Sequence, residues 1–466
     1  MPSRDAHLQF EKWAREYGPI YSLMLGTKCL IVISTPEAAK ELLDRRSRIY
    51  SDRQDMYIGQ TLCSGGLRGY EPRWRMSRKM IHGLLNVVTS KRYLHYQMLE
   101  NRQMLYQLLN DPDGFLKHIR RYSNALTTTM VFGWRTATYE DPKMKQLFDG
   151  FSEFSAINQT GTAAIVDFFP WLGQRLPDFV LPTQRKAKEL HKHEKALYLS
   201  HWMRAKQEAE DGTIKPCFCM GMYEAQKQEQ FSDEQAAYIG GTLLEAGSDT
   251  TSSTLYAFVQ AMLLFPDVQR KAQVKIDRVI GPERMPVMDD ISDLPYIRSF
   301  TQNDEYMGYF IPAGAGILHN VWSIHMDPKR QPNPREFNPD RYKGDEQSLG
   351  DAASNPDPLK RDVYTFGAGR RICPGIHVAE RSLFLAMSRI LWAFDIAPAL
   401  DPVTKGPIIP DPDRLTQGFV CMPEEYPARI TPRSKERADH VIKEWKDAEK
   451  TNLDMKAKQW VQNPLA

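Results

Sequence analysis

The ten residues 366–375 read FGAGRRICPG, and this stretch decides the fold. Gly367 and Gly369 allow the backbone to turn sharply and to come close to a flat ligand. Cys373 follows, and Pro374 suits the first turn of a helix that begins there. A thiolate near a helix N-terminus is stabilised by the helix dipole and by amide groups that have no partner inside the helix. The stretch therefore predicts a loop that offers a thiolate to a flat ligand.

The remaining cysteines show what Cys373 would be without this context. A lone cysteine in apolar surroundings is usually a packed core side chain, which is our interpretation of Cys29, Cys63 and Cys421. Around Cys373 the two glycines favour a ligand instead, and the guanidinium of Arg371 can neutralise an anionic group nearby. We therefore single out Cys373 as the candidate metal ligand.

A second stretch, AGSDTT at residues 246–251, lies inside a long apolar segment. Ser232 and Gln235 form a capping-box pair before that segment and Pro266 ends it, so we expect one long helix. Gly, Ser, Asp and Thr are poor helix formers, and a Thr hydroxyl can bond back to a carbonyl and open the helix locally. The stretch therefore predicts a groove for water that Asp249 can supply with protons. The alternative is a simple kink or a close helix crossing.

Two weaker patterns complete the set. Trp74 and Arg78 lie four residues apart and therefore share one helix face. Alone, they would indicate an exposed basic helix with one aromatic residue. Residues 337–341, FNPDR, lie in a segment rich in Pro, Asn and Arg that is typical of a coil.

Along the chain the four patterns follow one another as Trp74 and Arg78, then residues 246–251, 337–341 and 366–375. In this order they resemble the motifs of the cytochrome P-450 family of haem-thiolate monooxygenases. The resemblance implies that Cys373 binds the iron of haem b and that its thiolate pushes electron density onto the iron. It also implies that Thr250 orients dioxygen and that Asp249 belongs to the proton relay. The residues implied in haem binding are Trp74, Arg78, Ala246, Gly247, Phe366, Gly369, Arg371 and Gly375.

The resemblance also implies an architecture. We expect a fold that is mainly α with small β-sheets, as a single large cytochrome P-450-like catalytic domain over residues 1–434, with the long central helix over the haem. Residues 435–466 are expected to form a charged, helical and solvated C-terminal tail. Apolar runs at 20–25 and 29–33 predict a hairpin, and residues 418–430 suggest another.

Composition restricts the partners. The net charge is only +3, so no strong field points to nucleic acid. No run of 18 apolar residues occurs, and the chain as it stands predicts a soluble cytoplasmic protein. The resemblance instead implies the cytosolic face of the endoplasmic reticulum membrane, through an anchor. No dinucleotide-binding glycine motif or flavin module is visible, so the resemblance implies electrons from NADPH through a separate NADPH-cytochrome P-450 reductase.

The implied function is insertion of one oxygen atom from O2 into an apolar small molecule. The stretches GPIYSLMLG and ITPRS are similar to those of filamentous-fungal members, many of which act in secondary-metabolite biosynthesis. One alternative is a haem-thiolate enzyme that isomerises or dehydrates without a reductase. Another is a non-catalytic or defective haem-binding relative. Phe151, Phe154 and Phe419 are candidates to line an apolar pocket, although such residues are more often plain core.

One departure from the family pattern supports the second alternative. After residues 294–300, LPYIRSF, the family has a helix with a Glu-x-x-Arg motif and then a strand that lines the substrate pocket. Here residues 306–312 already resemble the hairpin beyond that missing part. A helix needs on the order of ten residues, so helix and strand together have no room.

The missing motif has an expected consequence and an expected cause. Arg341 would lose its usual partners, and a buried charge left unpaired costs about 3–5 kcal/mol. Our hypothesis is that a mis-drawn exon boundary removed the segment and that the true protein contains it. Transcripts that read Phe300 directly into Thr301 in every clone would sink this hypothesis.

Overall fold

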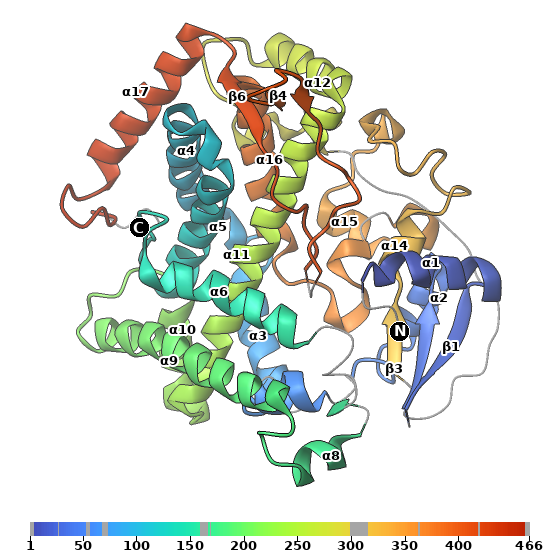
Figure 1. Cartoon of the computed structure of the whole chain (residues 1–466). Coiled ribbons are helices and arrows are strands. Elements are labelled where there is room, and N and C mark those ends of the chain that lie inside the picture. Colours follow the sequence, from blue (N-terminus) through green and yellow to red (C-terminus); the bar gives the residue numbers. More distant parts are fainter. Residues whose placement is uncertain are drawn as a thin grey trace.

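The computed structural model describes residues 4–26, 28–52, 56–67, 73–158, 166–167, 169–298, 316–361, 364–417 and 420–461. Helices make up most of this part, and two three-stranded sheets accompany them. Figure 1 shows one sheet to the right and the other at the top, with the helices between and below them. The predicted fold class, mainly α with small β-sheets, is confirmed.

The predicted long helix is α11, Asp233–Leu264, which runs through the middle of the molecule (Figure 1). The Ser232 hydroxyl accepts from the Gln235 amide at 3.2 Å and the Gln235 side chain accepts from the Ser232 amide at 3.1 Å, so the capping box is formed. Apolar side chains surround α11, and neighbours therefore cover it on several sides. Its main neighbours are α5 (Phe115–Phe132), α9 (Pro182–Glu210) and α16 (Ile376–Ala393).

The remaining helices pack around this centre. Two of them, α10 (Phe218–Glu229) and α12 (Pro266–Val279), contact α11 directly. At the N-terminal end, α1 (Ala6–Tyr17) packs on β1 (Ile20–Leu25) of the first sheet and on α14 (Val321–His325). The other helices are α2 (Pro36–Ala39), α3 (Arg73–Leu85), α4 (Leu94–Asn110), α6 (Pro142–Ile157), α8 (Pro170–Arg175), α13 (Pro295–Arg298) and α15 (Leu349–Ser354). The searched residues contain no helix that combines the length and the apolarity needed to cross a membrane.

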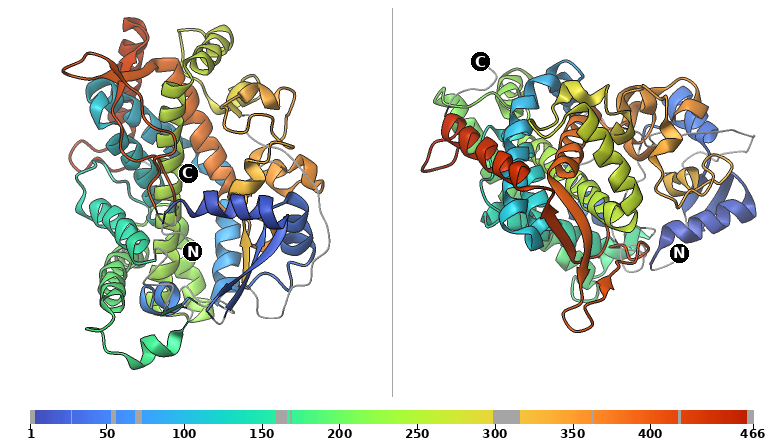
Figure 2. Two further views of the ribbon diagram at one scale, coloured as in Figure 1. Left: turned by 45° about the vertical axis from the view of Figure 1, so that its right-hand side comes forward. Right: turned by 90° about the horizontal axis from the view of Figure 1, so that it is seen from above.

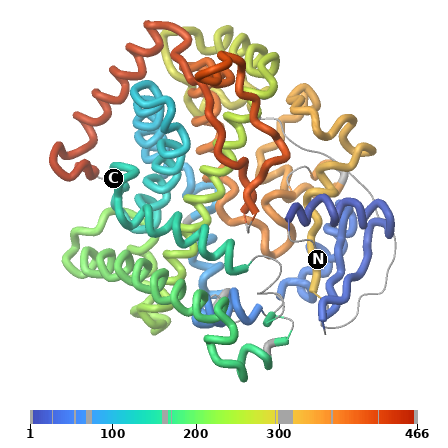
Figure 3. The backbone as a smooth tube through the Cα atoms, viewed as in Figure 1, coloured from blue at the N-terminus to red at the C-terminus, as the bar shows by residue number. Residues whose placement is uncertain are grey.

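The first sheet joins distant parts of the chain. Strands β1 (Ile20–Leu25) and β2 (Lys28–Ile33) form the predicted antiparallel hairpin, and β3 (Gly316–His319) adds to β2 in parallel. Figure 3 shows the consequence, because the N-terminal segment in blue and the later segment in orange lie side by side at the right. The N-terminal hairpin therefore shares its sheet with a strand from much later in the chain and does not form a separate domain.

The second sheet differs from the prediction. Strand β4 (Phe394–Leu400) lies between β5 (Pro407–Ile408) and β6 (Ala428–Pro432). The hairpin suggested for residues 418–430 is present with shifted bounds, because Leu415 pairs antiparallel with Pro423 and the Glu424 amide donates to the Arg414 carbonyl at 2.9 Å. The end of the predicted segment belongs to β6, which pairs with β4 instead. Pairing with a neighbour far along the chain cannot be recognised from a local apolar pattern.

The C-terminal segment is helical but not solvated, which corrects our prediction. Helix α17, Lys435–Asn452, lies along α4, as Figures 1 and 2 both show. Its buried face consists of Arg437, Val441, Trp445 and Ala448. Beyond the helix, Trp460 is only 6% exposed and packs edge-on against Tyr96, with ring centroids 5.2 Å apart. The many charged residues of this segment hide from the sequence reading that its apolar residues recur at helical spacing. These apolar residues form one face of α17, and that face packs on the main domain.

Candidate active site

The loop before α16 has the geometry that its glycines predict. Gly367 has φ +76° and Gly369 has φ +65°, in the left-handed region where side chains are strained. A Cβ atom at Gly369 would lie 1.8 Å from the Leu43 carbonyl oxygen, so only glycine fits there. The Cys373 amide donates to the Phe366 carbonyl at 2.8 Å and closes the loop. The loop thus fixes the position of Cys373 just before the helix.

Two groups near Cys373 favour its thiolate, and burial opposes it. Burial raises the pKa of the Cys373 thiol, whereas the Gly375 amide and the Arg78 guanidinium lower it. Arg78 donates to the Ile372 carbonyl at 2.6 Å, which holds the predicted basic residue against the loop. A cationic ligand on the sulfur would offset the cost of burying a thiolate. The balance suits a thiol that ionises when it binds a metal.

The other predicted haem contacts are placed unevenly. Arg371 lies in the same loop and donates from Nε to the Ser51 carbonyl at 3.0 Å. Trp74 lies on α3, one turn before Arg78, but its side chain is outside the described part. The structure therefore places Arg78 and Arg371 beside the cysteine loop and leaves the role of Trp74 a prediction.

The wall opposite Cys373 is the AGSDTT stretch of α11. The Thr250 hydroxyl donates to the Ala246 carbonyl at 2.6 Å, and Thr254 donates in the same way to Thr250 at 2.8 Å. These are the back-bonds that we expected from Thr residues in the middle of a helix. Gly247 has a second reason to be small, because a Cβ there would lie 2.5 Å from Thr127 Oγ1 on α5. The alternative of a close helix crossing is thus also realised.

Cys373 and the α11 stretch share one predominantly apolar cavity. Phe366, Cys373, Pro374, Gly375 and the beginning of α16 form one side, and α11 forms another with Leu243, Ala246, Gly247, Thr250 and Thr251. Leu126, Met130 and Val131 of α5 close it at one edge, together with Leu85, Tyr93 and Phe218. A flat apolar ligand bound through one axial sulfur fits this set of residues. The apolar lining residues of α3, α5 and α10, together with Tyr93, escaped the sequence analysis, because no motif separates them from ordinary core.

Asp249 faces away from that cavity's lining. Its carboxyl hydrogen-bonds to Ser253, and burial raises its pKa, with Arg120 lowering the pKa and Glu245 raising it. Ser253 also contacts the sulfur of Met422 at 3.7 Å. A buried carboxyl beside a second carboxylate keeps its proton more readily than an exposed one. Asp249 can therefore store a proton one residue away from Thr250.

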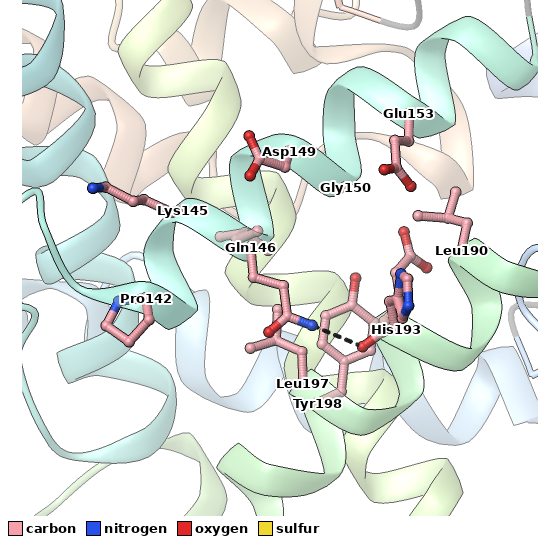
Figure 4. A pocket seen from close by; sticks show the side chains of 12 residues that line it. Pro142, Lys145, Gln146, Asp149, Gly150, Glu153, Leu190, His193, Leu197 and Tyr198 are labelled. Carbon is pink, nitrogen blue, oxygen red and sulfur yellow. Dashed lines mark hydrogen bonds between the residues drawn. The ribbon is translucent and has the colours of Figure 1, made fainter.

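A second, larger cavity lies outside this site, between α6 and α9. It has a volume of about 460 Å³, and Figure 4 shows Lys145, Asp149, Glu153 and His193 around its opening. Gln146 donates to the His193 carbonyl at 3.2 Å across it. It shares no lining residue with the cavity beside Cys373. The proposed pocket residues Phe151 and Phe154 pack against core clusters instead, and Phe419 lies outside the described residues.

Arg341 is not left unpaired, which corrects our expectation. Its guanidinium donates to the carbonyls of Pro332, Asn333 (2.6 Å) and Glu336 (3.2 Å) and to the Gln331 side chain. The arginine thus folds the coil around itself, and backbone dipoles replace the partners that the missing motif would supply. The predicted cost of an isolated charge does not arise at this residue.

Unpaired polar groups occur elsewhere, around Tyr364. The Nε2 atoms of His319 and His325 and the Nε and Nη1 atoms of Arg361 are buried without a hydrogen-bond partner in the described part of the chain. Both histidines contact the Tyr364 ring edge-on, at centroid distances of 5.4 and 6.2 Å. Burial lowers the pKa of His319 to about 4 and that of His325 to about 3. Residues 299–315, where we placed the break in the family pattern, lie outside the described residues.

Comparisons with known proteins agree with the site. The model of the family Cytochrome P450 matches residues 2–301 and 297–429. The chain is 48% identical to cytochrome P450 monooxygenase virE of Hypocrea virens, over 96% of this chain and 85% of that protein. It is 47% identical to cytochrome P450 monooxygenase fogE of Aspergillus ruber, over 96% and 86%. A zebra fish cytochrome P450 with progesterone superposes with a TM-score of 0.69 at 21% identity, over 93% of this chain and 100% of that one.

Proposed function

Because this chain belongs to the cytochrome P450 family, we propose that it is a monooxygenase that inserts one oxygen atom from O2 into an apolar small molecule. One observation carries the proposal. The sulfur of Cys373 and the Ala246–Thr251 stretch of α11 line the same apolar cavity. A site built in this way holds an apolar substrate near a sulfur-bound haem iron and excludes bulk water.

The chain's own residues have separate tasks in this proposal. Haem bound through Cys373 supplies the redox and oxygen chemistry, and its thiolate ligand favours cleavage of the O–O bond. Arg78 and Arg371 hold the anionic edge of the haem. Thr250, whose hydroxyl is held by the Ala246 carbonyl, orients dioxygen and exposes α11 to water. Asp249 stores a proton and delivers it to the Thr250 side of the helix.

The setting of the reaction is also a proposal. Electrons come from NADPH through a separate NADPH-cytochrome P450 reductase, and the protein works at the cytosolic face of the endoplasmic reticulum. The substrate is an intermediate of fungal secondary metabolism, as the resemblance to fungal monooxygenases supports. The retained Asp249–Thr250 pair favours this function over isomerisation or dehydration without a reductase.

The test is the spectrum of the reduced protein with carbon monoxide, after expression with haem supplied. A strongly red-shifted Soret band is expected because Cys373 ligates the iron as a thiolate. Cys373→Ser should lose that band, whereas Cys421→Ser, the exposed cysteine, should keep it. A wild-type spectrum typical of a neutral thiol, or the absence of haem, would favour the defective haem-binding relative instead.

A further inference from the structure

A second carboxyl group on α11 lies one helical turn before Asp249. Glu245 and Asp249 are four residues apart and therefore share a face of the helix. The Glu245 charge is one of the groups that raise the pKa of Asp249. A carboxylate one helical turn away therefore favours the protonated form of Asp249.

Glu245 is connected in turn to Tyr198 on α9. The Tyr198 hydroxyl donates a very short hydrogen bond to Glu245 Oε1. The tyrosine is 1% exposed, and a Cβ on Gly241 of α11 would lie 2.4 Å from its ring. The close crossing of α9 over α11 therefore fixes this ring, and with it the direction of the hydroxyl.

Tyr198 also lines the cavity between α6 and α9 (Figure 4). The opening of this cavity carries the exposed residues Asp149, Glu153 and His193, and its deeper part carries the buried Glu194 and Tyr198. Titratable groups thus continue from the surface to Tyr198. The apolar cavity beside Cys373 shares none of these lining residues.

From this arrangement we infer that Tyr198 and Glu245 supply protons from the cavity between α6 and α9 to Asp249. The inference rests on the proposed role of Asp249. When Asp249 has delivered its proton, two carboxylates face each other. A water molecule in the cavity then gives a proton to the Tyr198 oxygen and takes one back from solvent at the cavity opening, Tyr198 passes its phenolic proton to Glu245, and Glu245 passes one to Asp249. Each group gains one proton for each that it loses, and no electrons move.

Tyr198 and Glu245 act through Asp249 and are therefore positioning residues. A measurement that responds to proton delivery can distinguish this role from a purely structural one. Glu245→Gln and Tyr198→Phe should each lower product formed per NADPH by about tenfold and divert reduced oxygen to hydrogen peroxide, as partial loss of a general-acid pathway does. The solvent deuterium isotope effect on turnover should rise in both variants. Glu245→Asp should recover part of the coupling, because it keeps a carboxyl group.

Matched controls exist on the same helices. Tyr238→Phe removes the hydroxyl that bonds to His191 Nδ1 at 2.6 Å and keeps the ring that packs edge-on against Tyr198. Glu234→Gln neutralises a carboxyl in the first turn of α11 that pairs with Lys195 at 2.6 Å. Both controls should keep the wild-type coupling and isotope effect.

A readout without turnover completes the test. Infrared difference spectra of the resting protein in H2O and D2O should show the band of the protonated Asp249 carboxyl group. The band should shift in Glu245→Gln and persist in Glu234→Gln. If Asp249→Asn uncouples turnover but Glu245→Gln and Tyr198→Phe behave like their controls, the supply path is wrong while the role of Asp249 stands. If Asp249→Asn has no effect either, the role of Asp249 fails and the inference fails with it.

Discussion

Gly247 is the residue where packing and function meet most closely. Its missing side chain lets α11 approach α5, where a Cβ would come within 2.5 Å of Thr127 Oγ1. The same residue lines the cavity opposite Cys373. A methyl group there must push the two helices apart or displace Thr127.

We therefore expect Gly247→Ala to lower the free energy of unfolding by about 1–3 kcal/mol, the usual cost of overpacking. The double variant with Thr127→Ala should recover most of it, because the clashing atoms are gone. Gly221→Ala is the control, since nothing lies within 4 Å of that site on α10, and it should be neutral or stabilising. Urea unfolding of the wild type, Gly247→Ala, Thr127→Ala and the double variant measures the coupling. Additive effects would show that the contact does not exist.

A buried histidine provides a pH prediction. His201 is 4% exposed and stacks against Phe132 and Trp134 at centroid distances of 4.8 and 5.6 Å. Burial lowers its pKa to about 3, with a further contribution from Lys143 and Arg204. Because the folded protein resists protonation that the unfolded chain accepts near pH 6.5, stability falls as the pH drops below that value.

From pH 7 to pH 5, His201 should account for a loss of roughly 2 kcal/mol, at about 1.4 kcal/mol for each pH unit below 6.5. Between pH 7 and pH 5, the free energy of unfolding of His201→Phe should fall by about 2 kcal/mol less than that of the wild type. His193→Gln, an exposed histidine of the same helix, should leave the pH dependence unchanged. Unfolding curves at the two pH values decide the matter, and an unaltered slope in His201→Phe would contradict it.

At the scale of elements, the sequence was most informative where local chemistry alone determines the conformation. The capping box of α11, the hairpin β1–β2 and the glycine loop at residues 366–375 all follow from residues close together in the chain. Their conformations depend on φ angles and neighbouring hydrogen bonds, which the residue types reveal.

Long-range pairing was beyond the sequence. Nothing near residues 428–432 indicates that β6 pairs with β4 rather than within a hairpin, because strand pairing depends on the surface that a distant strand offers. The candidate site shows the same limit. Cys373, Arg78, Arg371 and Thr250 belong to motifs, whereas Tyr198 meets Glu245 only through the crossing of α9 over α11.

The C-terminal segment was misjudged for a related reason, and its docking can be tested. Arg135 donates to the Lys458 carbonyl at 3.0 Å and exchanges two bonds of 2.9 Å with Gln459, which brings Trp460 onto Tyr96. Arg135 also belongs to the buried ion cluster with Glu100, at 2.6 Å. The segment therefore completes the surface of α4 and α5.

Trp460→Ala should destabilise the protein by about 3–5 kcal/mol, as for other buried tryptophans. Lys443→Ala is the control, because its ion pair with Asp447 is exposed on the outer face of α17 and should contribute less than about 1 kcal/mol. Thermal unfolding of both variants compares the docked residues beyond α17 with the exposed face of that helix. Equal, small effects would restore the solvated tail that we first expected.

At the scale of the whole molecule, two observations bear on the break in the family pattern. The family model matches the chain in two segments that meet at residues 297–301. Buried nitrogen atoms of His319, His325 and Arg361 have no hydrogen-bond partner among the described residues. Each such group costs about 1–3 kcal/mol. These observations support our hypothesis that a segment with acceptor groups is missing between Phe300 and Thr301.

Restoring a helix with a Glu-x-x-Arg motif and the following strand between Phe300 and Thr301 should therefore raise both haem content and stability. We expect a gain of about 1–3 kcal/mol for each buried nitrogen that the insert supplies with a hydrogen-bond partner. An insert of equal length with Gln in place of its Glu is the control and should recover much less. His325→Leu separates the two chains further. It should stabilise the present chain, where the imidazole nitrogen is unpaired, and destabilise the restored one, where it would be bonded. If the present chain already binds haem fully and gains nothing from the insert, the deletion is a natural feature of a working enzyme and the gene-model hypothesis fails.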